Sequence, residues 1–422
     1  MASLETTASR PTRWAANLLA AFAVPGFRWL WASHHLYSIS LMMGRLALGW
    51  LVLTLTSSPF LVGLAAGLEG VGKVGFGLFA GALVDRWNRR TLFVTGLLIN
   101  GGLGLALGVL LFLGRLALWH VLVAALMQGA VDSLLASASN TMLYDLVGRA
   151  RVVNGSAAKL LSFNLARITG SAVAGALIDR AGMAACFLVL GGLACVAALP
   201  ALRIRSTFTR SGKAEPFVRA IQGGLRYAWQ NAPVRQLLGL SMIVEMFGFA
   251  HYTMVPVIAR DVLHVGAAEL GWLSSVAGLG ALVGTVIVAS LGDFKHKGAL
   301  LMAVTASAGV GLVAFAFSPW YAVSLALSTL VGGVLVAYDV LMHALFQLIA
   351  SDAVRGRVFS LYVLTFGFHP LGGFLAGSVA TLAGAPVAVG LGGAVLVAYC
   401  LSALRRVREI RPTAEAAAPA GD

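Results

Sequence analysis

Charged residues are scarce in this sequence of 422 residues. Asp, Glu, Lys and Arg together make up 11% of the chain, against about 25% in soluble proteins, whereas hydrophobic residues make up 59%. A water-soluble fold of this length cannot remove so much apolar surface from water. The composition therefore excludes a string of soluble domains and predicts a protein that crosses a membrane several times.

Cysteine is also rare. The three cysteines, Cys186, Cys195 and Cys400, all lie in apolar runs, which excludes a disulfide framework and indicates buried thiols. The sequence contains no Walker A motif, so ATP is not expected to act on this chain directly. We expect neither a metal site nor another cofactor, and no enzymatic activity.

Long apolar runs dominate what the sequence does contain. A membrane span needs about 20 mostly apolar residues, and the bilayer admits only helices or a closed barrel. The runs are about twice as long as barrel strands and do not alternate in polarity, so they predict an all-α membrane protein. Twelve transmembrane helices are expected, at 28–55, 60–84, 91–113, 118–140, 154–178, 183–202, 235–258, 268–291, 299–317, 320–342, 358–382 and 385–404.

The basic residues predict the orientation. Of the 30 Lys and Arg, 23 lie on the side that carries both termini, three lie on the other side and four lie inside spans. Because cytoplasmic loops carry the excess of Lys and Arg, both termini are expected in the cytoplasm, in a multi-pass protein of the cell (inner or plasma) membrane. The same bias explains the net charge of +14, so no nucleic acid partner is expected.

The first and second halves of the sequence resemble each other. With an offset of 208, Gly63 and Asp85 match Gly271 and Asp293, and a basic loop follows each Asp. Such a repeat is typical of transporters. It predicts two pseudo-symmetric six-helix bundles, at 28–202 and 235–404. We expect a cytoplasmic linker at 203–234 that contains an amphipathic helix. Residues 1–27 are expected to form a cytoplasmic tail or an interfacial helix, and residues 405–422 a cytoplasmic tail.

The loop after the second expected helix carries a signature. It resembles the G-x-x-x-D-R-x-x-R-R motif of the major facilitator superfamily, a family of secondary transporters with twelve helices, and the resemblance covers essentially the whole chain. Segments 259–272 and 355–362 are similar to a bacterial branch of drug and siderophore exporters. Departures from antiporter motifs occur at Ala125 and Ser171. The resemblance implies alternating access and a gating role for Asp85, Arg86, Arg89, Arg90, Asp293 and Lys297.

Eight ionisable residues lie inside the expected spans. Each costs about 2.5–3.5 kcal/mol at the centre of a bilayer if it faces lipid unpaired, so these residues must pair or face a wet cavity. Desolvation favours the neutral form of a carboxyl group, which suits a group that loads and unloads a proton. The acids are the candidates for proton coupling, with Glu245 and Glu69 first, followed by Asp132 and Asp339.

The other charged residues leave alternatives open. Glu69 and Lys73 are four residues apart, on one face of a helix, and form either a structural ion pair or a cavity site. Arg45 either pairs with Glu69 or holds an anionic substrate. For Asp132 the alternative role is structural pairing, for example with Arg167 or with Lys159. The substrate-cavity candidates are Arg45, Lys73, Tyr37, Phe247, His251 and Arg167, although the aromatic residues could instead pack and His251 could make an interfacial hydrogen bond.

These features together predict a secondary active transporter. We expect a monomeric, proton-coupled antiporter that exports amphipathic small molecules such as drugs by alternating access, with the substrate, protons and the bilayer as its partners. One alternative substrate is an organic anion such as a siderophore or a lysolipid. An alternative of another class is a membrane sensor or scaffold that does not transport.

Overall fold

A computed structural model describes residues 20–205, 225–291, 294, 296–349 and 355–407. Within these ranges the chain is helical and contains no strand, and eleven stretches are long and apolar enough to cross a membrane. The predicted all-α membrane fold is therefore confirmed. Asp293, most of the expected linker and most of each expected tail lie outside the described residues. Residues 20–27 of the expected first tail form η1 and the start of α2.

The first half of the chain, here the N half, begins with a short 3-10 helix, η1 (Ala20–Ala23). Four long helices follow: α2 (Pro25–Thr56), α3 (Pro59–Arg86), α4 (Arg89–Phe112) and α5 (Leu118–Leu202). Positive φ angles at Gly148 and Gly182 divide α5 into a first segment (118–147), a second segment (149–181) and a third segment (183–202). The stretch Arg151–Leu202 would be about 78 Å long as one helix, far more than a bilayer of about 30 Å. The division at Gly182 agrees with the prediction of six crossings in this half.

Tight turns between helices follow from local sequence. Ser57 ends α2 in the left-handed conformation, and the Ser58 hydroxyl caps α3 by accepting from the backbone N–H of Leu61. Pro59 then occupies the first turn of α3, where its missing N–H costs nothing. Asn88 caps α4 in the same way. These caps explain why the observed helices begin within a few residues of their expected positions.

The second half of the chain, the C half, starts with an irregular crossing. It consists of α7 (Ala232–Ile243), the π-helix η2 (Val244–Phe249) and α8 (His251–Asp261), where the sequence predicted one plain helix. Another expected helix is broken between α12 (Arg355–Thr365) and α13 (Phe368–Ala383). The remaining helices are continuous: α9 (Ala267–Ser290), α10 (Lys297–Ala316), α11 (Tyr321–Ile349) and α14 (Ala385–Val407).

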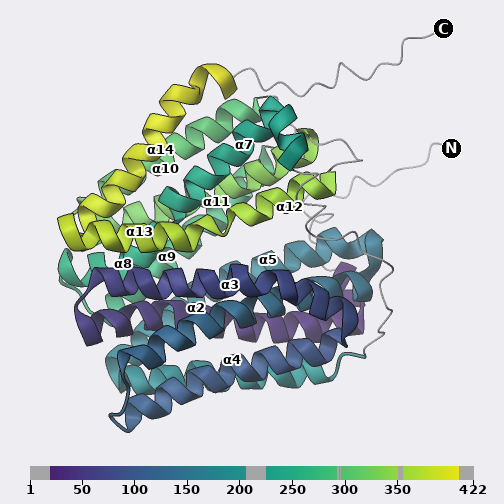
Figure 1. Cartoon of the computed structure of the whole chain (residues 1–422), viewed down its shortest axis with the longest axis vertical. Helices are drawn as coiled ribbons and strands as arrows, with labels where there is room; N and C mark the ends of the chain where they lie inside the picture. Colours follow the sequence, from purple (N-terminus) through teal and green to yellow (C-terminus); the bar gives the residue numbers. More distant parts are fainter. Residues whose placement is uncertain (1–19, 206–224, 292–293, 295, 350–354, 408–422) are drawn as a thin grey trace, which may run out of the picture.

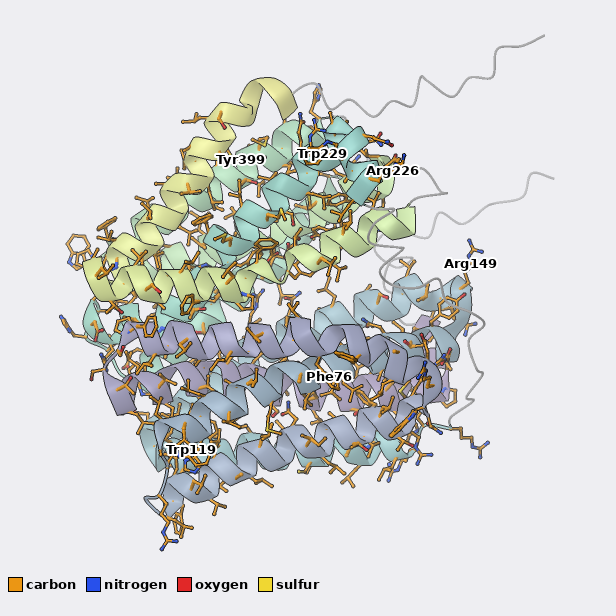
Figure 2. All side chains as sticks on the ribbon, in the orientation of Figure 1. Phe76, Trp119, Arg149, Arg226, Trp229 and Tyr399 are labelled. Carbon is orange, nitrogen blue, oxygen red and sulfur yellow. The ribbon has the colours of Figure 1, made fainter. Side chains whose placement is uncertain are left out.

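The two ends of the bundle differ in charge. The end where α2 starts, and where α3 and α14 end, is here named the linker end (Figure 1). The labelled basic residues Arg149 and Arg226 lie at this end, and Trp119 lies at the opposite, far end (Figure 2). The bias of basic residues read from the sequence therefore corresponds to one physical end of the molecule.

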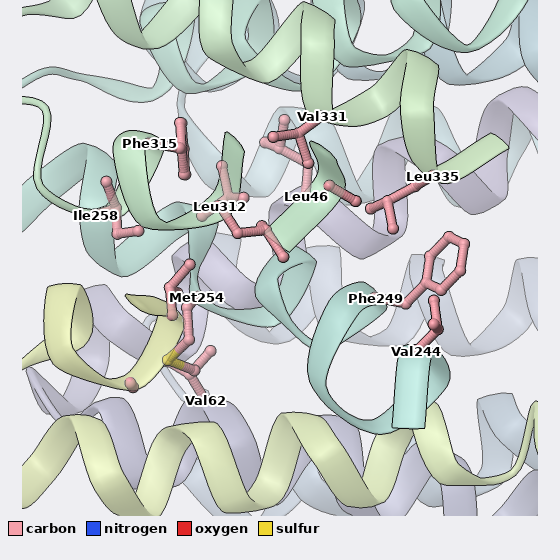
Figure 3. Close-up of a cluster of buried hydrophobic side chains, with 14 of the residues drawn as sticks. Leu46, Val62, Val244, Phe249, Met254, Ile258, Leu312, Phe315, Val331 and Leu335 are labelled. Atoms are coloured by element: carbon pink, nitrogen blue, oxygen red, sulfur yellow. The ribbon is translucent and has the colours of Figure 1, made fainter. Parts of the chain in front are cut away.

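The N half and the C half touch each other toward the far end. The backbones of Gly63 in α3 and Gly377 in α13 approach so closely that a Cβ on Gly63 would lie 3.0 Å from the Gly377 Cα. Gly175 in α5 meets Gly271 in α9 in the same manner. Small residues allow such close helix crossings. Apolar side chains of both halves, including Leu46 of α2, join one continuous core here (Figure 3).

A second apolar core is confined to the N half. It contains Phe27, Leu30, Phe93 and Leu97, and it lies nearer the linker end. Its residues come from η1, α2, α3, α4, α5 and the turn that follows α5, and none comes from the C half. The two cores therefore lie at different positions between the ends of the bundle. The core shared by both halves lies toward the far end, and the core of the N half lies toward the linker end.

Candidate functional site

Charged residues meet at mid-depth between the two halves. Arg45 of α2 and Glu69 of α3 form an ion pair, with 4.0 Å between Nη2 of Arg45 and Oε1 of Glu69. Their side chains are 44% and 24% exposed. Of the two alternatives for Arg45, the structure therefore shows the ion pair with Glu69. Lys73 is exposed one turn further along α3, and no ion pair joins it to Glu69 among the described residues.

Glu245 lies in the π-helix η2 and is 3% exposed. Its Oε2 atom is 3.9 Å from Nδ1 of His369 in α13, and the charges of Asp339 and Lys73 also act on it. Lys73 belongs to the other half, so the two halves influence each other electrostatically at this point. π-Helical turns occur frequently at functional sites. No pattern in the sequence predicted the π-helix, and His369 was not among the predicted site residues.

Asp132 is buried in the first segment of α5, where three neutral donors satisfy it. Its Oδ1 atom accepts from the Tyr37 hydroxyl, from Nε2 of Gln128 at 3.2 Å and from Nδ2 of Asn100 at 3.5 Å. The suggested pairing with Arg167 or Lys159 is wrong. Asn100 and Gln128 were not among the predicted site residues, although Gln128 precedes Asp132 by one helical turn. The candidate Tyr37 binds Asp132 and is itself buried.

The two bases of the second α5 segment have neutral partners instead of acids. Lys159 donates to Oγ of Ser139 at 2.8 Å and to Oδ1 of Asn140 at 2.7 Å. Arg167 donates across the junction of the halves to the Tyr252 hydroxyl, at 3.2 Å, and also to Asn164 at 3.4 Å. Arg167 thus lies where the halves meet.

Asp339 of α11 carries a buried oxygen, Oδ1, that has no hydrogen-bond partner among the described residues. The charge of Arg167, from the opposite half, acts on this carboxyl group. His343 contacts the backbone oxygen of Asp339 at 2.9 Å and the Tyr362 hydroxyl at 3.3 Å. An acid with an unsatisfied oxygen beside histidine and tyrosine side chains can bind and release a proton.

Phe247 and His251 lie elsewhere in the C half. They line a small pocket together with residues of α13 and α14, among them Gly372 and Gly392. The His251 ring binds the backbone oxygen of Gly248 at 2.6 Å. The lining of this pocket includes none of the other cavity candidates, but Tyr252, the residue after His251, binds Arg167.

The signature loop after α3 has one firm contact. Arg89 is buried and forms an ion pair with Asp145 of the first α5 segment, a residue that the sequence analysis did not identify. Asp85 and Arg86 are exposed, and Asp85 has no hydrogen bond or ion pair in the part of the chain that the structure describes. The cap of α4 is Asn88, three residues after Asp85. Arg90 is half-buried, and Lys297 donates to the backbone oxygen of Phe294 at 3.2 Å.

Two helical halves that hold charged residues between them, in a chain with eleven stretches able to cross a membrane among its described residues, are typical of a multi-pass membrane transporter. A sequence profile of one family, described as transmembrane secretion effector, matches residues 16–420. The chain belongs to this family. The predicted fold and superfamily are thereby confirmed.

Characterised relatives and solved structures agree with this assignment. The chain is 25% identical over 409 residues to the enterobactin exporter EntS of Shigella boydii serotype 4 (strain Sb227), covering 95% of this chain and 97% of that protein. It is 27% identical over 318 residues to the multidrug efflux pump Tap of Mycolicibacterium fortuitum, covering 73% and 77%. The nucleoside transporter NupG has a similar fold, with a TM-score of 0.71 at 15% identity over 90% of this chain and 98% of that one. A bacterial homologue of the human lysosomal transporter Spinster gives a TM-score of 0.66 at 15% identity, over 95% and 94%.

Proposed function

We propose that this protein is a proton-coupled exporter of amphipathic small molecules that works by alternating access. The observation that carries the proposal is the meeting of charged residues from both halves at mid-depth, with Arg45, Glu69 and Lys73 on one side and Glu245 and His369 on the other. Such residues are costly in lipid and mark substrate or proton pathways in membrane proteins. Relatives that are named as an enterobactin exporter and a multidrug efflux pump support export.

Glu245 is the proposed proton carrier. It is almost fully buried, and the charge that reaches it from Lys73 comes from the opposite half. When the halves move relative to each other, the field of Lys73 at Glu245 changes. The free energy of ionising Glu245 then depends on which side of the membrane the cavity faces, and this dependence couples proton movement to the conformational cycle.

The contacts between the halves support a state that is closed at the far end. The close approaches of Gly63 with Gly377 and of Gly175 with Gly271 lie there, whereas Asp85 at the linker end is exposed and unpaired among the described residues. We place the linker end in the cytoplasm because the basic residues gather at it. In this proposal the protein is ready to receive substrate from the cytoplasm, and Asp85 engages only after the linker end closes.

The test uses purified protein in proteoliposomes with an imposed pH gradient and a cationic rhodamine ester as the transported dye. Glu245→Gln keeps the size of the side chain but cannot ionise, so pH-driven dye transport should fall to the level of empty liposomes. Asp179→Asn is the matched control, because Asp179 is exposed near the Gly182 turn at the far end. Full pH-driven transport by Glu245→Gln would refute the assignment of the proton carrier.

An organic anion is the second candidate substrate. Arg45 and Lys73 expose basic side chains at the junction of the halves, and a relative is named as an exporter of enterobactin. Comparing the transport of enterobactin with that of the cationic dye in the wild-type protein distinguishes the two substrate classes.

A further inference from the structure

Lys159 is a buried cation that has only neutral partners. Its residue is 8% exposed, and its ammonium group donates to the Ser139 hydroxyl and to the Asn140 side-chain oxygen. Within the described residues no carboxylate pairs with it. Asp132, an acid of the neighbouring α5 segment, is satisfied by three other donors. A buried charge normally has an ionic partner, and the ammonium group of Lys159 has no anionic partner among the described residues.

The four bases inside the expected spans all belong to the N half, and the C half contributes none. Arg45 has a carboxylate partner, and Arg167 binds a tyrosine and an asparagine. Lys159 is only eight residues from Arg151, where the second α5 segment begins to cross, or about 12 Å at 1.5 Å per residue. Of the four, Lys159 therefore lies nearest to the linker end, on the wall that belongs to the N half.

A row of exposed residues on the first α5 segment leads to the partner of Lys159. Ala136, Asn140 and Tyr144 follow each other at intervals of one turn, share one face and are all exposed. Further toward the far end, this side of the segment packs on α3, where Gly129 touches the backbone of Glu69. The face lies between α3 and the second α5 segment, and both of these contact the C half. Exposed residues of the N half therefore lead from the linker end to Asn140, the partner of Lys159.

We propose that Lys159 and Asn140 form an anion-binding subsite near the linker end, which receives the carboxylate or phenolate group of an amphipathic substrate. The inference rests on the proposed function, since it adds organic anions as one class among the amphipathic substrates of the exporter. The ammonium group binds the charge of the anion, Asn140 holds the ammonium in place, and Tyr144 offers its ring at the entrance. The subsite is separate from the Arg45–Glu69 pair, which lies deeper.

Two dyes with the same xanthene skeleton and opposite charge test the subsite. Binding of fluorescein, an anion, and of a cationic rhodamine ester is measured by fluorescence anisotropy on full-length protein in phosphatidylcholine nanodiscs. Lys159→Gln should weaken fluorescein binding about ten- to a hundredfold, the range for losing a charged hydrogen bond, and should leave the rhodamine ester unaffected. Lys159→Arg keeps the charge and should retain fluorescein binding. Lys213→Gln removes the same charge in the linker sequence and should change neither dye.

Fluorescein binding that is unchanged in Lys159→Gln would overturn the proposal, as would an equal loss of both dyes, which indicates a structural role. Asn140→Ala gives a second readout, with a smaller but equally selective loss. Competition by added phosphatidylglycerol would show that a lipid headgroup takes the site and would overturn its assignment to a solute. Binding is measured without a pH gradient, so a failure of proton-coupled transport is seen separately.

Discussion

The junction of Gly175 with Gly271 should control how easily the far end opens. A Cβ at Gly175 would lie 2.5 Å from the backbone oxygen of Ala267 and 2.8 Å from the Cα of Gly271. Both atoms belong to the α9 backbone, which cannot move aside as a flexible side chain could. Gly175→Ala must therefore push α5 and α9 apart.

The size of the effect follows from the cost of overpacking. Inserting a methyl group into a tightly packed site costs about 1–3 kcal/mol, and the cost disappears once the halves separate at the far end. Since about 1.4 kcal/mol corresponds to a tenfold change in an equilibrium constant, Gly175→Ala should favour the state that is open at the far end by about five- to 150-fold.

Distances between spin labels measure this shift. Labels at Leu113 and Trp320, which are 57% and 71% exposed near the far end of the two halves, report separation by double electron–electron resonance in a protein without its native cysteines. Gly175→Ala should increase the population of long distances. Gly192→Ala is the matched control, because a Cβ at Gly192 meets no atom within 4 Å. Equal distance distributions in both variants would refute the reasoning.

Two further predictions concern ion and hydrogen-bond contacts. Arg260→Ala removes the hydrogen bond of 2.8 Å to the backbone oxygen of Leu53 across the halves. It should favour the state that is open at the far end by about 0.5–1.5 kcal/mol, seen as more long distances between the same labels. The exposed Arg115→Ala is the control, and an unchanged distance distribution in Arg260→Ala would contradict the prediction. Replacing only one of Arg89 and Asp145 leaves the other charge without its partner, so Asp145→Asn or Arg89→Gln should each destabilise the protein by about 1–3 kcal/mol. The double variant should lose less than the sum in thermal unfolding, and strict additivity would show that the pair does not interact.

Physical constraints that act on short stretches made much of the fold predictable. A span must be long and apolar, and its ends are marked by residues such as Ser58, Pro59 and Asn88, whose capping roles are local. The observed helices accordingly agree with the expected spans to within a few residues at most ends. The repeat and the signature loop identified the superfamily, because both are patterns along the chain.

The partners of the charged residues could not be predicted in this way. From the sequence, Arg167 or Lys159 was suggested as the partner of Asp132. In the structure, the packing of α2 and α4 against α5 provides Tyr37 and Asn100 as partners instead. Asp145 was overlooked as the partner of Arg89, because 56 residues separate them.

The sequence by itself determined that this chain spans a membrane with helices and that its buried charges need partners. These conclusions depend on composition and on periodicity, which a linear chain displays. The tertiary structure decided that the halves join toward the far end, that Glu245 lies in a π-helix near His369, and that Lys159 is held by neutral groups. Contacts between helices depend on their rotation and separation, and these are set by the packing of the whole bundle.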